Sequence, residues 1–252
     1  MTTFGQQLKS WRATRRLSQL DLASEAAVSS RHISFLESGR SRPSQPMVMH
    51  LCDVLDIPKG QRNILLQSAG FAPFYTRSEL DEEHMTSVKD AMSRLLVQHD
   101  PYPAIILDQL WTIVDLNRSA TMLFGLAGLS EGDSLLIWLE DTSRAAAVIE
   151  NWAEVGHHSM VRLRNESRAL GGVAELDAAA ERLSKDPHVK SFQPVSALAP
   201  VLSTIYTAGG LRLPLFSTYA SFGGADDLTV SELKIELMFP ATPEADTLLN
   251  TL

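Results

Sequence analysis

The chain is poor in cysteine and has no long apolar segment. Cys52 is the one cysteine among 252 residues, so no disulfide can form within the chain. No apolar run approaches the roughly 20 residues of a membrane-spanning helix. The first sixteen residues are amphipathic and lack the apolar segment of a secretory signal. These absences lead us to expect a cytoplasmic protein with no membrane partner.

Motifs that carry enzymatic chemistry are missing as well. The sequence contains no phosphate-binding glycine loop, no GxSxG, no HExxH and no paired cysteines. His157 and His158 are adjacent, so on a helix they would point about 100° apart and would not easily share one ligand. Together with His188, they are weak candidates for a haem ligand. We therefore expect no enzymatic activity, no metal and no required cofactor.

Charge is distributed unevenly along the chain. The formal net charge is −8, which taken as an average argues against a nucleic-acid partner. Residues 1–76 nevertheless contain nine Lys and Arg against five Asp and Glu, a net charge of +4. Residues 77–252 contain thirteen against twenty-five, a net charge of −12. A small basic domain joined to a larger acidic one is expected of a DNA reader that carries a second domain.

Helix signals follow one another closely in the first 70 residues. Phe4, Leu8 and Trp11 recur at helical spacing, which predicts a helix over residues 4–15. Three further helices are expected from their start signals, which are Ser18 with Asp21 in a capping box, Ser29 or Ser30, and Pro43 with Ser44. A fifth helix is expected over residues 61–69, after Pro58 and Gly60. Gly39 can end the third helix in the left-handed conformation. The segment is therefore predicted to be an all-α domain of five helices.

The centre of this domain matches a known pattern. LSQLDLASEAAVSSRHISFLESGRSRP resembles the helix-turn-helix core of the XRE/Cro-C1 phage-repressor family. The matching positions, in order and spacing, are Leu17-Ser18-Gln19, Leu22-Ala23, Val28-Ser29, Ile33, Leu36-Glu37, Gly39 and Arg42-Pro43. The resemblance covers residues 4 to about 70. It implies that the third helix enters the major groove of double-stranded DNA and reads base edges with its N-terminal side chains.

The resemblance also implies which side chains contact an operator. The DNA-binding residues expected are Gln19, Ser29, Ser30, Arg31, Ser34, Arg40 and Arg42. Arg31 is the strongest candidate for a base reader, because a guanidinium can bond O6 and N7 of guanine together. Gln19 and Ser29 match positions that contact the DNA backbone, and Arg40 and Arg42 can neutralise phosphates.

Each of these residues also has a structural interpretation. Ser29 and Ser30 are good helix caps and could serve only as such. Arg31 could be a solvated surface charge. Phe35 could touch a thymine methyl or could belong to the core, and we favour the core.

The pattern changes after residue 72. Residues 73–99 are expected to form a connector that contains a helix with an apolar stripe. Residues 102–108 and 109–117 are predicted to be two strands joined by a tight turn at Asp108-Gln109. Asn117 then caps a helix.

Helical and extended segments complete the chain. Residues 135–168 and 173–185 are predicted to be helical, before a turn at Asp186-Pro187. The remaining elements expected are extended segments at about 200–207, 211–222 and 228–239 and a short helix at Pro243–Leu249. With the first two strands, the three segments would form a five-stranded antiparallel sheet with helices on one face, so the fold class is α+β.

This half also resembles a known family. PYPAIILDQLWTIVDLNRSATMLFG, LLIWLEDTSRAAAVIENWAE and VRLRNES look like the PAS-like ligand-binding domain of MmyB-like transcription regulators, which follows an XRE-type helix-turn-helix in the same order. The resemblance covers roughly residues 100–240 and departs from the family pattern over residues 209–216. The domains expected are 1–72 for DNA binding, 73–99 as a helical connector, and 100–252 for ligand binding and dimerisation.

The second resemblance implies a sensor whose pocket binds a small apolar ligand, such as a fatty acid or another acyl chain. The side chains expected to line the pocket are Trp111, Met122, Phe124, Ile137, Trp138, Phe216, Met238 and Phe239. The alternative for each of them is that it only fills the core. Arg118, Arg144 and Arg212 are candidates for pairing with a ligand carboxylate, although each is also typical of a surface charge.

Two functions remain open at this point. The first is a ligand-responsive transcription regulator that binds its DNA operator as a homodimer, since repressors of this type bind two half-sites symmetrically. The second is a regulator whose C-terminal domain serves only dimerisation or protein interaction, without a ligand. We favour the first.

Overall fold

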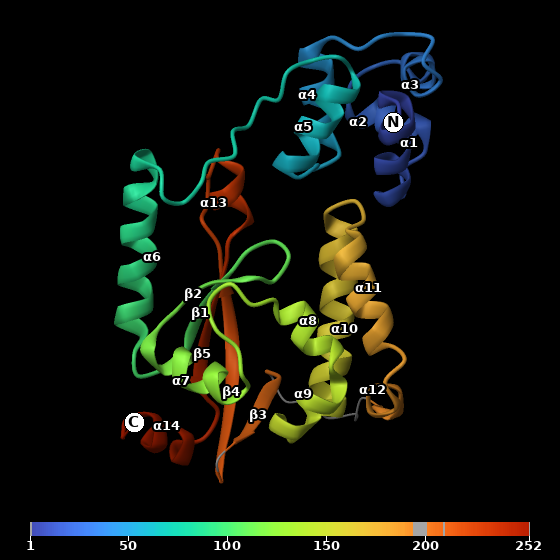
Figure 1. The fold of residues 1–252 in the computed structure, drawn as a ribbon. Coiled ribbons are helices and arrows are strands. Elements are labelled where there is room, and N and C mark those ends of the chain that lie inside the picture. The colour runs from blue at the N-terminus through green and yellow to red at the C-terminus, as the bar shows by residue number, and fades with distance from the viewer. Residues whose placement is uncertain (1, 194–200, 209, 252) are drawn as a thin grey trace. The chain divides into compact units, whose positions relative to one another are not determined.

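The computed structural model of the protein describes residues 2–193, 201–208 and 210–251 (Figure 1). The chain divides into two compact units. The first is made mostly of the residues up to Arg77 and the second mostly of the residues from Ser78 on. Within the described ranges, no helix is both long and apolar enough to cross a membrane.

The first unit is the predicted all-α domain. Its helices are α1 Phe4–Thr14, α2 Gln19–Glu25, α3 Ser30–Glu37, α4 Gln45–Val54 and α5 Lys59–Ser68. The first four begin after a side-chain oxygen that accepts from a backbone N–H three residues on, and these caps are Thr3, Ser18, Ser29 and Ser44. Helix α5 begins two residues before its predicted start, because Pro58 has a φ of −57° and leads directly into the helix.

Every helix of the first unit contributes to one apolar core. Its fully buried members include one side chain from each helix, namely Leu8, Leu22, Ile33, Leu51 and Leu66. Burying one such side chain stabilises a protein by roughly 1.5–3 kcal/mol. The same core holds the small side chain of Ala23, which lets α2 and α3 approach closely. The helical spacing of Phe4, Leu8 and Trp11 is confirmed, because all three are buried in this core.

The second unit contains a five-stranded sheet and its helices. The strands are β1 Ala104–Leu107, β2 Ile113–Leu116, β3 Ser203–Ala208, β4 Leu211–Ala220 and β5 Lys234–Pro240. The helices are η1 Glu83–Met85, α6 Thr86–His99, α7 Arg118–Leu126, α8 Leu135–Glu140, α9 Thr142–Val148, α10 Trp152–Ala169, α11 Ala174–Leu183, α12 Pro187–Ser191, α13 Leu228–Glu232 and α14 Pro243–Leu249. Residue 200, where one predicted extended segment begins, lies outside the described residues.

The sheet is antiparallel throughout, in the order β2-β1-β5-β4-β3. Its register places Glu236 of β5 opposite Ile105 of β1 on one side and Tyr219 of β4 on the other. Met238 lies two residues along the same face, opposite Ser217. The antiparallel five-stranded sheet with flanking helices confirms the predicted PAS-like α+β fold.

Helices pack on both faces of the sheet, which corrects the expectation of helices on one face only. Met92 and Leu96 of α6 pack against Ala104 and Ile106 of β1. Figure 1 shows α6 on one side of the sheet and helices α8 and α10 on the other. All four residues of β1 are buried for this reason. A short apolar run without alternation is typical of such a doubly covered strand.

Three local details differ from the sequence prediction. Trp111 lies in the turn before β2, not in the strand, because the carboxylate of Asp108 accepts from the N–H groups of Leu110 and Thr112 and closes the turn there. Residues 228–232 form α13, since alternation over so few residues does not separate a helical turn from a strand. Asp186 does not simply end a helix but caps the further helix α12.

Candidate functional sites

The outer face of α3 carries the residues predicted to read DNA. Ile33 and Leu36 face the core, so Ser30, Arg31 and Ser34 lie on the opposite side of the helix. Ser30 and Arg31 are exposed and Ser34 is half-buried. Ser29 caps the helix, where its Oγ accepts from the backbone N–H of His32 at 3.2 Å. The structure thus places Ser30, Arg31 and Ser34 together on one accessible surface.

Phe35 supports two arginines on this surface. The guanidinium of Arg31 lies over the Phe35 ring, 5.1 Å from its centroid, and that of Arg40 lies at 5.9 Å. Phe35 is half-buried and lies outside the core cluster, so the preference for a core role was wrong. The chain turns back after α3 through Gly39, whose φ is +73°. Arg42, further along this turn, is exposed.

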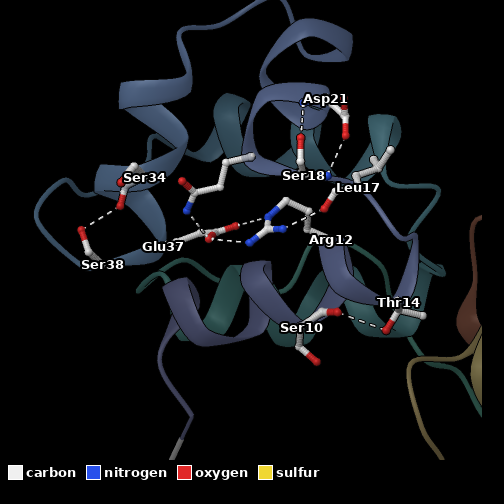
Figure 2. Close-up of polar contacts among 10 residues, drawn as sticks. Ser10, Arg12, Thr14, Leu17, Ser18, Asp21, Ser34, Glu37 and Ser38 are labelled. Carbon is white, nitrogen blue, oxygen red and sulfur yellow. Dashed lines mark hydrogen bonds and ion pairs between the residues drawn. The ribbon is translucent and has the colours of Figure 1, made fainter.

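Gln19 belongs to a polar network beneath this surface. Glu37, at the end of α3, accepts from Arg12 Nε at 2.6 Å, from Arg12 Nη2 at 3.0 Å and from Gln19 Nε2 at 2.7 Å. Figure 2 shows Arg12 and Glu37 pointing toward one another. Burial opposes ionisation of Glu37, but the bonds from Arg12 and Gln19 outweigh it and lower the pKa of its carboxyl. The network ties α1, α2 and α3 together and fixes the amide of Gln19.

An apolar cavity of about 370 Å³ lies in the second unit, on the sheet face away from α6. Of the side chains predicted to line a pocket, it is lined by Trp111, Phe124, Trp138 and Met238. Further lining residues come from α8, α10 and the strands β3 to β5, so elements far apart in the sequence enclose it.

The other predicted pocket residues lie elsewhere. Met122 lines a neighbouring apolar pocket of about 450 Å³, which shares Leu123 and Tyr206 with the first cavity. Phe216 and Phe239 stack on each other with ring centroids 5.6 Å apart and are not among the residues that line either cavity. Ile137 is 71% exposed, because the buried side of the short helix α8 is formed by its neighbours.

Arg162 of α10 provides the cavity with a cation. Its guanidinium lies 4.4 Å from the centroid of the Trp111 ring and 3.8 Å from that of Tyr219. Its Nε donates to Glu166 at 2.8 Å, and its Nη1 lies 3.9 Å from a carboxylate oxygen of Glu236. Arg162, Tyr219 and Glu236 all line the cavity. This end of the cavity is therefore polar and charged.

Glu166 does not line the cavity, but it accepts hydrogen bonds from three side chains at this polar end. It accepts from the indole Nε1 of Trp111 at 2.8 Å and from Lys234 Nζ at 2.9 Å, in addition to Arg162. Burial opposes ionisation of Glu166, but Lys234 and Arg162 lower the pKa of its carboxyl. Burial also lowers the pKa of the Lys234 ammonium, although Glu166 opposes this. The cluster is compact and its hydrogen bonds are mutually supporting.

Trp111 reaches this cluster through an unfavourable backbone conformation. Its φ is +61°, a region that bulky side chains rarely adopt. The Asp108 turn and a bond from the N–H of Leu135 to the Trp111 carbonyl, 2.9 Å long, hold it there. Such strain of order 1–3 kcal/mol persists where the surroundings enforce it, often at functional sites.

The family comparison follows the same division of the chain. A family model described as the MmyB-like transcription regulator ligand binding domain matches residues 88–252. The chain belongs to this family. A model of the helix-turn-helix domain matches residues 3–65 of the MmyB-like regulator. Together they make the architecture that of a DNA-binding transcription regulator with a ligand-binding domain.

The solved structure of the PAS domain from Bordetella pertussis BvgS is similar to the MmyB-like regulator at 16% sequence identity. The match covers 64% of this chain and 94% of that chain, with a TM-score of 0.29. No significant match was found among curated proteins.

Arg162 of the regulator was not among the pocket residues predicted from the sequence. Among the described residues, the cavity lining includes Arg162 but not Arg118, Arg144 or Arg212. Arg144 donates to the backbone carbonyl of Ala127 at 2.8 Å, and Arg212 forms an ion pair with a surface glutamate at 2.8 Å. The spacing of Arg162 and Glu166 predicts an ion pair on one helix face. Nothing in that spacing indicates that the pair faces a cavity.

Proposed function

We propose that this MmyB-like regulator binds a DNA operator as a homodimer and that a small apolar ligand in its second unit regulates this binding. A fatty acid or another acyl chain is the class of ligand we favour. The observation that carries the proposal is the cavity of about 370 Å³ lined by Trp111, Phe124, Trp138 and Met238. Small-molecule sites are typically of roughly 300–1,000 Å³, mostly apolar, with a few placed polar groups.

The surface of α3 supports the operator-binding part of the proposal. Arg31 is exposed and is held over Phe35, so little side-chain entropy is lost when it contacts a base. Its guanidinium can bond guanine O6 and N7 in the major groove. Arg40 and Arg42 are exposed on the turn after the helix and can neutralise phosphates. Ser29, Ser30, Ser34 and Gln19 complete the proposed interface.

Mass spectrometry of the purified full-length protein tests the ligand. Under native conditions we expect a mass above that of the polypeptide, and under denaturing conditions the polypeptide mass alone with a small apolar molecule released. If the protein is empty, it can be incubated with acyl compounds and measured again. Protein that stays empty after both steps contradicts a sensing role.

Two arginine variants test the DNA interface. Arg31→Ala should weaken binding to the selected operator by about 1–3 kcal/mol and relax the preferred base at one position. Arg42→Ala should weaken binding to all sequences alike and reduce the slope of affinity against salt concentration. Operators selected from a random DNA pool provide the probe. If Arg31→Ala left the preferred site unchanged, the assignment of the base reader would be wrong.

A second function has one observation in its favour. Met122, Leu126 and Leu211 are 40%, 56% and 40% exposed, and all three line the neighbouring apolar pocket. Exposed apolar residues gathered in this way are typical of association surfaces. The second unit could therefore serve dimerisation alone. A protein that contains no ligand, takes up none and still elutes as a dimer would favour this function.

A further inference from the structure

The polar end of the cavity presents a donor and an acceptor side by side. Arg162 and Glu236 both line the cavity, and the nearest atoms of the two, Nη1 and Oε2, are 3.9 Å apart. That separation is within ion-pair range but is longer than a hydrogen bond. The two groups attract each other without occupying each other's hydrogen-bonding positions. A ligand head group at this end of the cavity would meet both.

Three side chains hold the guanidinium in this position. Trp111 and Tyr219 lie against it at 4.4 and 3.8 Å from their ring centroids, and Glu166 accepts from its Nε at 2.8 Å. The bond to Glu166 uses the Nε side of the planar group. The terminal amino groups keep donors for a further partner, and Nη1 lies 3.9 Å from a carboxylate oxygen of Glu236.

The carboxylate of Glu236 lies on β5, beside the strand that carries Tyr219. The register of the sheet places Glu236 directly opposite Tyr219 on the neighbouring strand. Burial and the nearby negative charge of Glu236 both raise the pKa of the Tyr219 hydroxyl, which is therefore protonated. Glu236 retains further lone pairs that can accept from a ligand.

The four ion-paired groups at this end balance one another in charge. Two cations, Arg162 and Lys234, face two carboxylates, Glu166 and Glu236. A ligand carboxylate bound to Arg162 would lie close to the like-charged Glu236. A ligand ammonium bound to Glu236 would lie close to the like-charged Arg162. Bringing like charges together lowers the affinity of a ligand. Either ionised head group would therefore bind at a disadvantage.

We infer that the cavity selects a ligand whose head group has no net charge and carries both an acceptor, for Arg162, and a donor, for Glu236. A primary amide at the end of an apolar chain is the simplest such group. The chain lies along Phe124, Trp138 and Met238. This inference rests on the proposed function and makes it more specific, because it ranks acyl amides above ionised fatty acids.

Calorimetric titration of the full-length protein at about pH 7 tests the ranking. The probes are decanamide, decanoate and decylammonium, which share one chain length and differ in the head group, each used below the concentration at which it aggregates. We expect decanamide to bind about tenfold more tightly, or better, than either ion. Decanoate or decylammonium binding as tightly as decanamide overturns the inference.

Glu236→Gln tests the residue responsible. The amide of glutamine carries no charge and can donate, so the variant should bind decanoate about tenfold more tightly than the wild type does. Its affinity for decanamide should fall by about fivefold, because a neutral acceptor replaces a charged one. Glu150→Gln is the matched control, since Glu150 is also paired with an arginine, Arg212, but does not line the cavity. An unchanged decanoate affinity in Glu236→Gln, with a folded protein, overturns the role of Glu236.

The outcomes separate this inference from the proposed function. Equal binding of all three probes would leave a ligand-binding cavity in place and would overturn only the selection of the head group. Failure of all three to bind would overturn this inference and the ligand-binding part of the proposed function, and would leave the proposed DNA interface in place. The wild-type ranking needs no variant, so it remains decisive if Glu236→Gln does not fold.

Discussion

The guanidinium of Arg31 lies over the ring of Phe35, 5.1 Å from its centroid, on the exposed side of α3. The same ring lies 5.9 Å from the guanidinium of Arg40, which follows the helix. One aromatic side chain therefore connects the proposed base reader with a proposed phosphate contact. Because the ring limits the conformations of both arginines, it should contribute to DNA binding without touching DNA.

Phe35→Leu tests that connection. The variant keeps an apolar side chain but removes the aromatic face, and exposed cation–π contacts contribute about 0.5–1 kcal/mol each. We expect operator affinity to fall roughly five- to tenfold, as measured by fluorescence anisotropy at fixed salt. Phe35→Tyr retains the ring and should bind nearly as the wild type does. Wild-type affinity in Phe35→Leu would show that the ring has no such role.

Glu37 makes the stability of the first unit depend on pH. Its side chain is 4% exposed and its pKa is lowered when folded, so it stabilises the fold fully above its unfolded pKa of about 4.3. That contribution is lost as the pH falls through the lower folded value. Urea unfolding at a series of pH values should show stability falling below about pH 4.3 in the wild type. Glu37→Gln should lose less over the same range, and equal slopes for the two proteins would contradict this assignment.

Helix starts could be predicted from signals within a few residues in the sequence. The residues that line the cavity could not all be predicted, because they depend on packing between distant segments. A capping serine acts on a backbone N–H three residues away, so Ser18 and Ser44 could be identified from the sequence alone. Arg162 could not, because the rings that enclose it come from segments that meet only when the sheet and α10 have packed. Ile137 has the composition of a pocket residue but points to solvent, since a single apolar residue does not specify its own face on so short a helix.

The two indole N–H groups at the cavity should differ in their contribution to stability. Trp111 donates to the carboxylate of Glu166 at 2.8 Å, whereas Trp138 donates to the neutral backbone carbonyl of Ala127 at 3.2 Å. Bonds to charged groups contribute about 1.5–3 kcal/mol and neutral ones about 0.5–1.5 kcal/mol. Trp111→Phe should therefore lower the free energy of unfolding by about 1 kcal/mol more than Trp138→Phe does. Urea denaturation checks this, and the reverse order would contradict it.

Cys52 offers a selective probe of the first unit, because it is the one cysteine in the sequence and it lies fully buried in that unit's core. Burial raises the pKa of its thiol to about 11. The thiolate is the reactive form, so at about pH 8 only roughly one thiol in a thousand would be ionised even if reagent could reach it. We expect iodoacetamide to modify the native protein at least about a hundredfold more slowly than the protein in guanidinium chloride.

Modification of Cys52 in the native protein requires opening of the helical unit, so the labelling rate reports the stability of that unit and not that of the sheet. Arg62→Ala removes a side chain that donates to the Ile57 carbonyl at 2.6 Å, and it should speed the labelling by loosening α4 against α5. Rapid labelling of the wild-type native state would place Cys52 outside a stable core.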